Sequence, residues 1–276
     1  MRAGRVTVEQ LRAITRSVGE RRGWDFSALR DERDPVPWDY HDVVRRYLHP
    51  GCRVLDVGTG GGERFLELVP LIGAGTGIDA SPDMVATARA NTPAALAGKV
   101  SFTVMDAGRL DLPDRGFDLV LNRHAPVYAA EIARVLRPGG FFITQQVGGR
   151  NTQSIFTAFG WESNAAFWRS YFSAPGAPPA PDSLDGPATL AAAFTRLGCI
   201  TRAVAEYDVA YWLSDLDSFV FFLKAVPLPE RFDPDLHWHQ VNRALSDCGS
   251  ARGIQTNEHR ELLITQKPPC QSVPQT

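Results

Sequence analysis

The sequence is poor in cysteine and shows no spacing typical of a metal site. It has four cysteines among 276 residues, and none forms a C-x-x-C pair, so the spacing of a zinc site is absent. Cys52 and Cys199 each open an apolar run, which indicates small buried thiols. His237 and His239 lie two positions apart, so they do not share a helix face. We therefore expect no metal centre.

The sequence also lacks an excess of basic residues and a long apolar run. It contains 29 Lys and Arg against 31 Asp and Glu, whereas sequence-independent binding of nucleic acid needs a basic surface. The sequence has no apolar run of about 18 residues, so no transmembrane helix is expected. Residues 1–17 lack the apolar stretch of a signal peptide. We therefore expect a cytoplasmic protein with no nucleic-acid or membrane partner, present as a monomer or homodimer.

From residue 52 onward, strand-like apolar runs alternate with helix-like segments. Such alternation predicts βαβ units and a parallel sheet, hence an α/β fold. The expected strands cover residues 52–57, 74–80, 100–106, 117–122, 140–147, 199–210 and 260–268. The expected helices cover residues 6–18, 39–48, 63–72, 81–91, 129–140, 187–198, 215–225 and 234–247. Two aromatic-rich stretches, 24–40 and 156–172, have no place in this sheet.

A glycine-rich turn, "VLDVGTGGGE" at 54–63, joins the first of these strands to the helix that follows. Glycines let the backbone approach a ligand closely, and the helix N-terminus adds free N–H donors. Asp79 ends the next strand, where a carboxylate can accept hydrogen bonds from ribose hydroxyls. Glu63 stands where a dinucleotide fingerprint has glycine. The turn therefore predicts an adenosine-type cofactor without a pyrophosphate.

The glycine turn and three later segments together resemble one enzyme family. The order Asp56, Gly58, Gly60, Gly62 resembles motif I of the class I S-adenosylmethionine-dependent methyltransferases. "GIDASPDMVATAR", "VMDAGRLDLPDRGFDLVLN" and "EIARVLRPGGFFI" resemble the later motifs, in order. The resemblance covers about residues 50–147 and extends more loosely over the strands up to residue 267. The chain also resembles a bacterial subgroup of small-molecule methyltransferases within this family. It implies a Rossmann-like, doubly wound, mostly parallel sheet with an antiparallel last strand, plus an aromatic-rich helical cap.

The resemblance also implies S-adenosylmethionine as cofactor and assigns its contacts. Gly58 and Gly60 would face the methionine part, Asp79 would bind both ribose hydroxyls, and Asp106 would accept from the adenine amino group. The backbone carbonyl of Asn122 would accept from the cofactor ammonium. The complete predicted cofactor site is Asp56, Gly58, Thr59, Gly60, Gly62, Asp79, Ala80, Met84, Asp106, Ala107, Asn122 and Arg123.

The methyl acceptor is expected at the end of the fourth strand, which reads "NRHAP". His124 has an ordinary pKa of about 6.5, so it suits a general base; the alternative is a histidine that only orients the loop. Adenine- and glutamine-methylating relatives carry Asn/Asp-Pro-Pro-Tyr at this position and this chain does not, so a small-molecule acceptor is favoured. The predicted acceptor pocket comprises Trp24, Trp38, Tyr40, Gln145, Gln146, Trp161, Trp168 and Tyr171.

The sequence leaves the acceptor atom open, and three other functions are kept as alternatives. These are non-methyl chemistry on the same cofactor (cyclisation or aminocarboxypropyl transfer), a nicotinamide oxidoreductase, and a cofactor-binding module without catalysis. The predicted parts of the chain are an N-terminal helical arm or lid at 1–49, an S-adenosylmethionine-binding core at 50–149, a cap insertion and linker at 150–186, the rest of the core sheet at 187–268 with a helical insertion at 211–258, and a disordered tail at 269–276.

Overall fold

The computed structural model describes residues 5–21, 26–173 and 180–269. Trp24, residues 174–179 of the predicted linker and residues 270–276 of the predicted tail lie outside these ranges. The chain forms two compact units. The first, here called the helical unit, comprises residues 1–37, 148–175 and 207–260, and the second, the sheet unit, comprises residues 38–147, 176–206 and 261–276.

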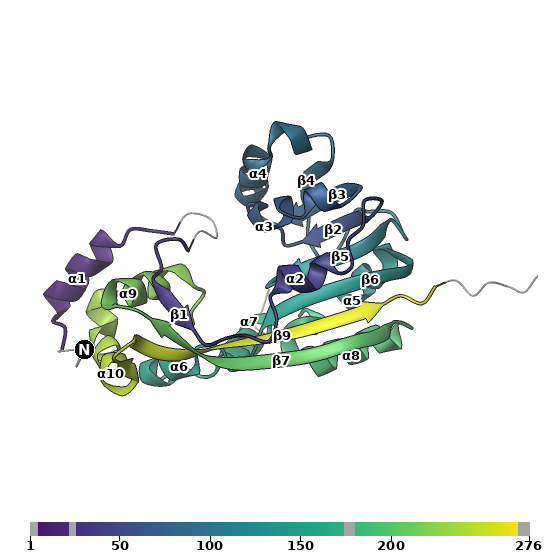
Figure 1. Cartoon of the computed structure of the whole chain (residues 1–276). Coiled ribbons are helices and arrows are strands. Elements are labelled where there is room, and N and C mark those ends of the chain that lie inside the picture. The colour runs from purple at the N-terminus through teal and green to yellow at the C-terminus, as the bar shows by residue number, and fades with distance from the viewer. Residues whose placement is uncertain (1–4, 22–25, 174–179, 270–276) are drawn as a thin grey trace, which may run out of the picture. The chain divides into compact units, whose positions relative to one another are not determined.

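The sheet unit is built on five parallel strands (Figure 1). They lie in the order β4-β3-β2-β5-β6, and each neighbouring pair is parallel. Their bounds are β2 Arg53–Val57, β3 Ala74–Asp79, β4 Val100–Val104, β5 Phe117–Arg123 and β6 Leu136–Val147. This arrangement confirms the predicted mostly parallel α/β sheet.

Two long strands, β7 (Ile200–Leu213) and β9 (Gly253–Gln266), extend the order beyond β6 as β6-β9-β7. The N–H of Lys267 donates to the carbonyl of Gly140, and the N–H of Gly148 donates to the carbonyl of His259. Residue numbers in β9 therefore decrease as those in β6 increase, so the two strands are antiparallel. The last strand is antiparallel, as predicted.

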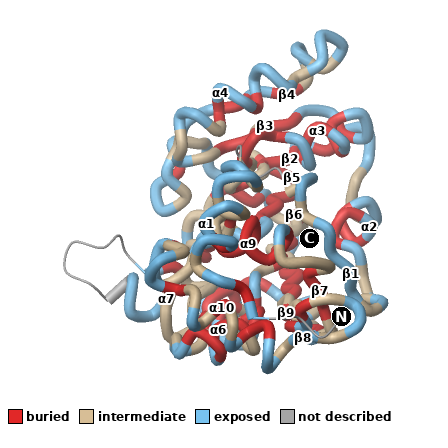
Figure 2. The backbone as a smooth tube through the Cα atoms, turned by 90° about the vertical axis from the view of Figure 1, so that its left-hand side faces the viewer, coloured by how far each residue is buried: buried red, intermediate tan, exposed pale blue. Residues whose placement is uncertain are grey.

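Both faces of the parallel sheet are covered by helices, so its central strands bury apolar side chains on both faces. On β2 and β5, Val54 and Leu119 face one core cluster, whereas Leu55 and Val120 face the other. The first cluster includes α2, α3 and α4, and the second includes α5 and α8. Figure 2 shows the central strands β2 and β5 as mostly buried. The helices of the sheet unit are α2 Tyr40–Arg45, α3 Glu63–Leu66, η1 Val69–Leu71, α4 Pro82–Asn91, η2 Ala94–Leu96, α5 Ala129–Val135, η3 Asp182–Asp185 and α8 Pro187–Arg196.

Prolines move two boundaries away from their predicted positions. The helix expected over 63–72 ends at Leu66 and continues as the short η1, because Pro70 lacks an N–H and its ring clashes with the carbonyl of Leu66. The helix expected over 129–140 ends at Val135, and β6 begins at Leu136. Pro138 disfavours a helix at the residue before it, so the chain is already extended there.

The helical unit has its own apolar core, which includes Leu11, Phe159, Phe219 and Val241. It contains the ends of β7 and β9 that belong to residues 207–260, with β1 paired antiparallel to β7. Its other elements are α1 Val8–Ser17, β1 Asp31–Arg33, α6 Gln153–Phe159, α7 Asn164–Ser173, α9 Leu216–Ala225, α10 Pro234–Cys248 and β8 Gly249–Ser250. Within the described ranges, no helix combines the length and apolar character needed to span a lipid bilayer.

Candidate active site

The order of the strands places a ligand site at the carboxyl ends of β2 and β5. From β2 the chain proceeds to β3 and β4 on one side, and β5 then pairs with β2 on the other side. Open α/β sheets bind ligands at such a reversal of strand order. The loops that begin there are the glycine loop, Gly58–Gly62, and the loop that follows Arg123.

The glycine loop depends on glycine for its conformation and for its space. Gly58 and Gly62 both have φ of +76°, in the left-handed region that other residues rarely adopt. A Cβ on Gly58 would lie 2.2 Å from the Cβ of Ala125, so the two site loops touch at this point. The N–H groups of Gly58 and Thr59 both donate to the carbonyl of Ile78 at 2.9 Å. The loop is therefore anchored to the end of β3.

Asp79 links the glycine loop to the start of α4. One carboxylate oxygen accepts from the N–H of Gly60 and the other from the N–H of Ser81, both at 2.9 Å. Ser81 caps α4 by accepting from the N–H of Met84, which is half-buried, while Ala80 is exposed. The predicted ribose-binding carboxylate is thus oriented by two backbone donors.

A second carboxyl group, that of Asp56, lies beneath the same loop. The pKa of Asp56 is raised to about 6, mainly by burial and also by the charge of Asp79, although the Thr59 hydroxyl and the Arg123 charge favour ionisation. The Thr59 hydroxyl is itself buried and makes no hydrogen bond of standard geometry within the described residues. Two neighbouring acids with little compensating charge favour a cationic ligand at this loop.

The next predicted group lies beyond β4, which ends at Val104 rather than at Asp106 as expected. The Asp106 carboxylate accepts from the N–H of Gly108 at 2.8 Å. This hydrogen bond stabilises a turn, so the chain does not continue as a strand here. Ala107 is half-buried beside it. The ring of Tyr128, at the start of α5, approaches Gly108, where an added Cβ would lie 3.4 Å from the ring. Burial, then the charge of Asp106, raises the pKa of Tyr128.

Tyr128 was not predicted from the sequence. The only available signal was an aromatic residue shortly after "NRHAP", which carries no distinctive spacing. Its approach to the Asp106 turn depends on how α5 packs, so local pattern does not specify it.

Asn122 is wholly buried and joins the ends of three strands. Its side-chain N–H groups donate to the carbonyls of Val57 and Pro126 at 3.4 and 3.2 Å. Its side-chain oxygen accepts from the Thr144 hydroxyl at 3.1 Å and from the Gln146 amide at 2.6 Å. All of its polar atoms are therefore used to fix the geometry of the site.

The backbone carbonyl of Asn122, predicted to face the cofactor ammonium, accepts from the hydroxyl of Tyr40 at 3.2 Å. The same hydroxyl lies 3.1 Å from the carbonyl of Ile143. Burial raises the pKa of Tyr40 far above its ordinary value, and the charge of Asp56 adds to this effect. Tyr40 is therefore a neutral donor that holds α2 against the ends of β5 and β6.

Trp38, Gln145 and His124, predicted separately, come together at the end of β5, where the acceptor is predicted. The indole N–H of Trp38 donates to the side-chain oxygen of Gln145 at 3.0 Å. The Gln145 amide nitrogen lies 3.4 Å from Nε2 of His124. His124 is exposed and has φ of +60°, and its backbone N–H donates to the Gln145 carbonyl at 2.9 Å. Arg123, beside it, is also exposed.

The three remaining described aromatics of the predicted pocket belong to the helical unit. Trp161 packs against Phe156 and Phe159, with ring centroids 5.6 and 4.5 Å apart. Trp168 contacts Tyr171 edge-on, with ring centroids 5.8 Å apart. Within that unit these rings pack mainly on one another, so their place at the acceptor remains a prediction.

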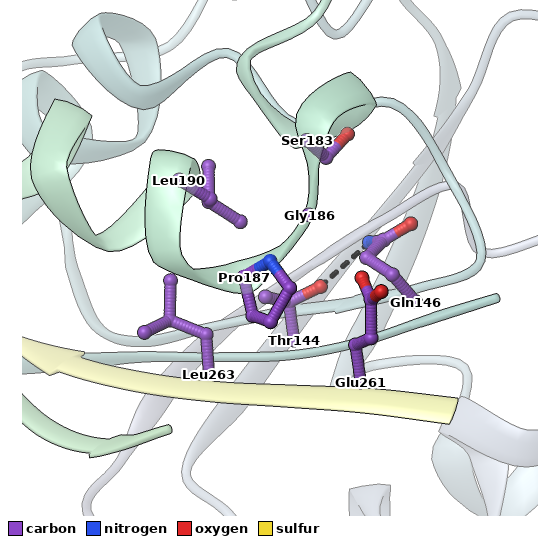
Figure 3. A pocket seen from close by; sticks show the side chains of 8 residues that line it. All are labelled: Thr144, Gln146, Ser183, Gly186, Pro187, Leu190, Glu261 and Leu263. Carbon is purple, nitrogen blue, oxygen red and sulfur yellow. Dashed lines mark hydrogen bonds between the residues drawn. The ribbon is translucent and has the colours of Figure 1, made fainter. Parts of the chain in front are cut away.

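A small cavity lies beside Gln146 (Figure 3). Gln146 donates to the Thr144 hydroxyl at 2.7 Å on one wall, and Leu190 of α8 points in from the other. The cavity includes no residue of the glycine loop. Its lining residues are Thr144, Gln146, Ser183, Gly186, Pro187, Leu190, Glu261 and Leu263.

Comparison with known proteins agrees with this geometry. Residues 54–140 match the family model described as a methyltransferase domain. The chain is 37% identical over 123 residues to 2-methyl-6-phytyl-1,4-hydroquinone methyltransferase of Synechocystis. The aligned segment covers 42% of this chain and 38% of that protein. It is 36% identical over 113 residues to the fatty-acid O-methyltransferase of Mycolicibacterium smegmatis. This aligned segment covers 38% of this chain and 40% of that protein. The matches span about two fifths of each relative.

A solved structure shows the same fold. A putative methyltransferase from Bacillus halodurans superposes with a TM-score of 0.54 and 17% sequence identity, over 83% of this chain and 99% of that chain. The likeness in fold covers most of the chain. The methyltransferase-domain match over residues 54–140, the similar methyltransferases and the shared fold together support a class I S-adenosylmethionine-dependent methyltransferase.

Proposed function

We propose that this protein transfers the methyl group of S-adenosylmethionine to a small-molecule acceptor by in-line displacement. The observation that carries the proposal is the pair of acids, Asp56 and Asp79, held at the glycine loop. S-adenosylmethionine carries a sulfonium and an ammonium and no phosphate, so neighbouring carboxylates favour it electrostatically. Asp79 alone would also suit the ribose of a dinucleotide, so Asp56 is the acid that disfavours a pyrophosphate at this loop.

The described residues offer suitable partners to each part of this cofactor. An ionised carboxylate has about four acceptor positions, and the backbone uses one on each oxygen of Asp79. The remaining positions suit the two ribose hydroxyls. A carbonyl oxygen has two lone pairs, so the Asn122 carbonyl can accept from the cofactor ammonium as well as from Tyr40. The Asp106 turn suits the adenine amino group, with the Ala107 N–H beside it.

The acceptor side of the proposal rests on the loop after β5. Methyl transfer from a sulfonium needs proximity, alignment and exclusion of water more than it needs activation of the methyl group. Trp38 and Gln145 border His124 there. The two relatives are named for a hydroquinone and a fatty acid, and both names support a small-molecule acceptor with an oxygen function.

Calorimetry with S-adenosylhomocysteine tests the cofactor assignment. Asp79→Ala removes the predicted acceptor of the ribose hydroxyls, and hydrogen bonds to a charged group contribute about 1.5–3 kcal/mol. Affinity should fall by about ten- to a hundred-fold. Asp83→Ala removes the same charge from an exposed position on α4 and should leave affinity within about twofold.

Binding of NAD in place of S-adenosylhomocysteine would instead support the oxidoreductase alternative. Incubation with methyl-labelled S-adenosylmethionine and a panel of fatty acids and hydroquinones then tests transfer. An unlabelled product, with the label retained in methylthioadenosine, would instead identify transfer of the aminocarboxypropyl arm.

A further inference from the structure

The contact between Trp38 and Gln145 determines which way the Gln145 amide faces. An indole N–H can donate a hydrogen bond but cannot accept one. It lies 3.0 Å from the side-chain oxygen of Gln145, so this oxygen must face Trp38. The amide nitrogen of Gln145 is then directed away from Trp38, and it lies 3.4 Å from Nε2 of His124.

The same logic applies to the His124 ring. An amide NH₂ group only donates, so Nε2 of His124 accepts in this contact and carries no proton. In a neutral imidazole the proton is then on Nδ1. A proton added at Nε2 would face the amide donor of Gln145. Trp38 and Gln145 thus select one tautomer of His124.

The backbone supports the same arrangement. The His124 N–H donates to the Gln145 carbonyl at 2.9 Å, so ring and main chain are both held by one residue. The φ of +60° at His124 is a sparsely populated conformation for a residue with a side chain. Conformations of this kind persist where surrounding contacts enforce them, and they gather at functional sites.

We propose that Trp38 and Gln145 are positioning residues that hold His124 as a neutral hydrogen-bond donor, and that the methyl acceptor is a carboxylate. The inference rests on the proposed methyl transfer. A general base needs an unprotonated nitrogen directed at the acceptor, but the unprotonated Nε2 faces Gln145. A proton-bearing Nδ1 instead suits an oxygen that is already anionic.

The acceptor class follows from ordinary acidities. Carboxylic acids ionise near pH 4, whereas a phenol ionises near pH 10, so at neutral pH only the carboxylate reacts without a base. Arg123 adds a positive charge next to His124 in the chain. The carboxylate oxygen forms a bond to the methyl carbon while the carbon–sulfur bond breaks, and that electron pair stays on sulfur. A methyl ester and S-adenosylhomocysteine result, and no proton is released.

The tautomer is measured directly by long-range ¹H–¹⁵N correlation spectra of the full chain labelled with ¹⁵N-histidine. The His124 signals are assigned by their loss in His124→Asn. The wild-type chain at pH 7.5 should show His124 protonated on Nδ1 only. Gln145→Glu replaces the amide donor by a carboxylate acceptor and should place a proton on Nε2. Trp38→Phe releases the amide and should give a mixture of tautomers, while the signals of His49 stay unchanged.

An Nε2-protonated His124 in the wild-type chain would overturn the inference, as would an unchanged tautomer in Gln145→Glu. Both outcomes are independent of cofactor binding, so they are distinguishable from failure of the proposed function, which would appear as absent binding of S-adenosylhomocysteine.

The acceptor class is tested with octanoate, benzoate and phenol as probes, together with methyl-labelled S-adenosylmethionine. Label should appear as the methyl esters of the acids and not as the methyl ether of phenol. Transfer to phenol would overturn the carboxylate assignment, and so would the absence of any ester in a chain that binds S-adenosylhomocysteine.

Two variants, His124→Asn and His124→Leu, distinguish a hydrogen-bond donor from a general base at this position. Asparagine tolerates positive φ and keeps an N–H donor, but it cannot take up a proton. Turnover with the reactive acid should stay within about tenfold in the asparagine variant and fall by about a hundred-fold in the leucine variant, because loss of the donor leaves the acceptor poorly positioned. Equal losses in both variants would favour a general base and contradict the donor role.

Discussion

The contact between Gly58 and Ala125 gives a quantitative test of how the two site loops are packed. Gly58→Ala adds a methyl group 2.2 Å from the Ala125 Cβ, whereas carbon atoms in contact lie about 3.5–4.0 Å apart. The loops must therefore separate by more than about an ångström. Overpacking of this kind typically destabilises by about 1–3 kcal/mol, and alanine at φ of +76° adds about 1–2 kcal/mol. We expect the free energy of unfolding to fall by about 2–5 kcal/mol.

A matched control isolates the effect of the backbone conformation. Gly198 has φ of +79°, and its missing Cβ has no atom within 4 Å. Gly198→Ala should therefore show only the conformational part, about 1–2 kcal/mol. The double variant Gly58→Ala/Ala125→Gly removes the colliding methyl group. It should recover about 1–3 kcal/mol of the loss, although the added glycine offsets part of this gain.

Urea unfolding followed by circular dichroism measures these differences, and calorimetry with S-adenosylhomocysteine reports on the site. The affinity should drop in Gly58→Ala and recover in the double variant, because the cofactor is expected between the same loops. If Gly58→Ala is no more destabilising than Gly198→Ala, or if Ala125→Gly gives no recovery, the two loops do not touch as described.

Three further predictions concern the groups beneath the site. Because the pKa of Asp56 is raised from 3.8 to about 6 by burial and by Asp79, Asp56 loses its proton at a higher pH in the folded state than in the unfolded state; the free energy of unfolding should fall by about 2 kcal/mol between pH 4 and pH 6, and Asp56→Asn should flatten this dependence in urea titrations at each pH. Tyr40→Phe removes the donor to the Asn122 carbonyl and should lower the free energy of unfolding by about 0.5–1.5 kcal/mol; an unchanged melting temperature would contradict this. Asn122→Ala leaves the Thr144 hydroxyl without its acceptor, removes one acceptor of the Gln146 amide, and removes the donor to the Val57 and Pro126 carbonyls; it should lower the free energy of unfolding by about 2–4 kcal/mol, more than Tyr40→Phe, in the same melting experiment.

The sequence by itself determined the type and order of the elements and the position of the cofactor loop. Apolar runs of strand length, helices with their caps and a cluster of glycines are local patterns, so they can be recognised without knowing which strands are neighbours. The parallel core and the antiparallel last strand agree with that reasoning. The missed boundaries at Leu66 and Leu136 arise where proline overrides a helical pattern.

Only the tertiary structure decided which side chains meet at the site. Trp38 and Gln145 are 107 residues apart, and Tyr40 and Asn122 are 82 apart, so no local periodicity relates them. Their hydrogen bonds exist because α2 packs on the first face of the sheet, where the ends of β5 and β6 lie side by side. The tautomer of His124 follows from this packing, since it depends on a donor delivered from a distant part of the chain. Local pattern specifies where a loop falls, whereas the hydrogen-bonding partner of each polar group depends on which segments the core brings together.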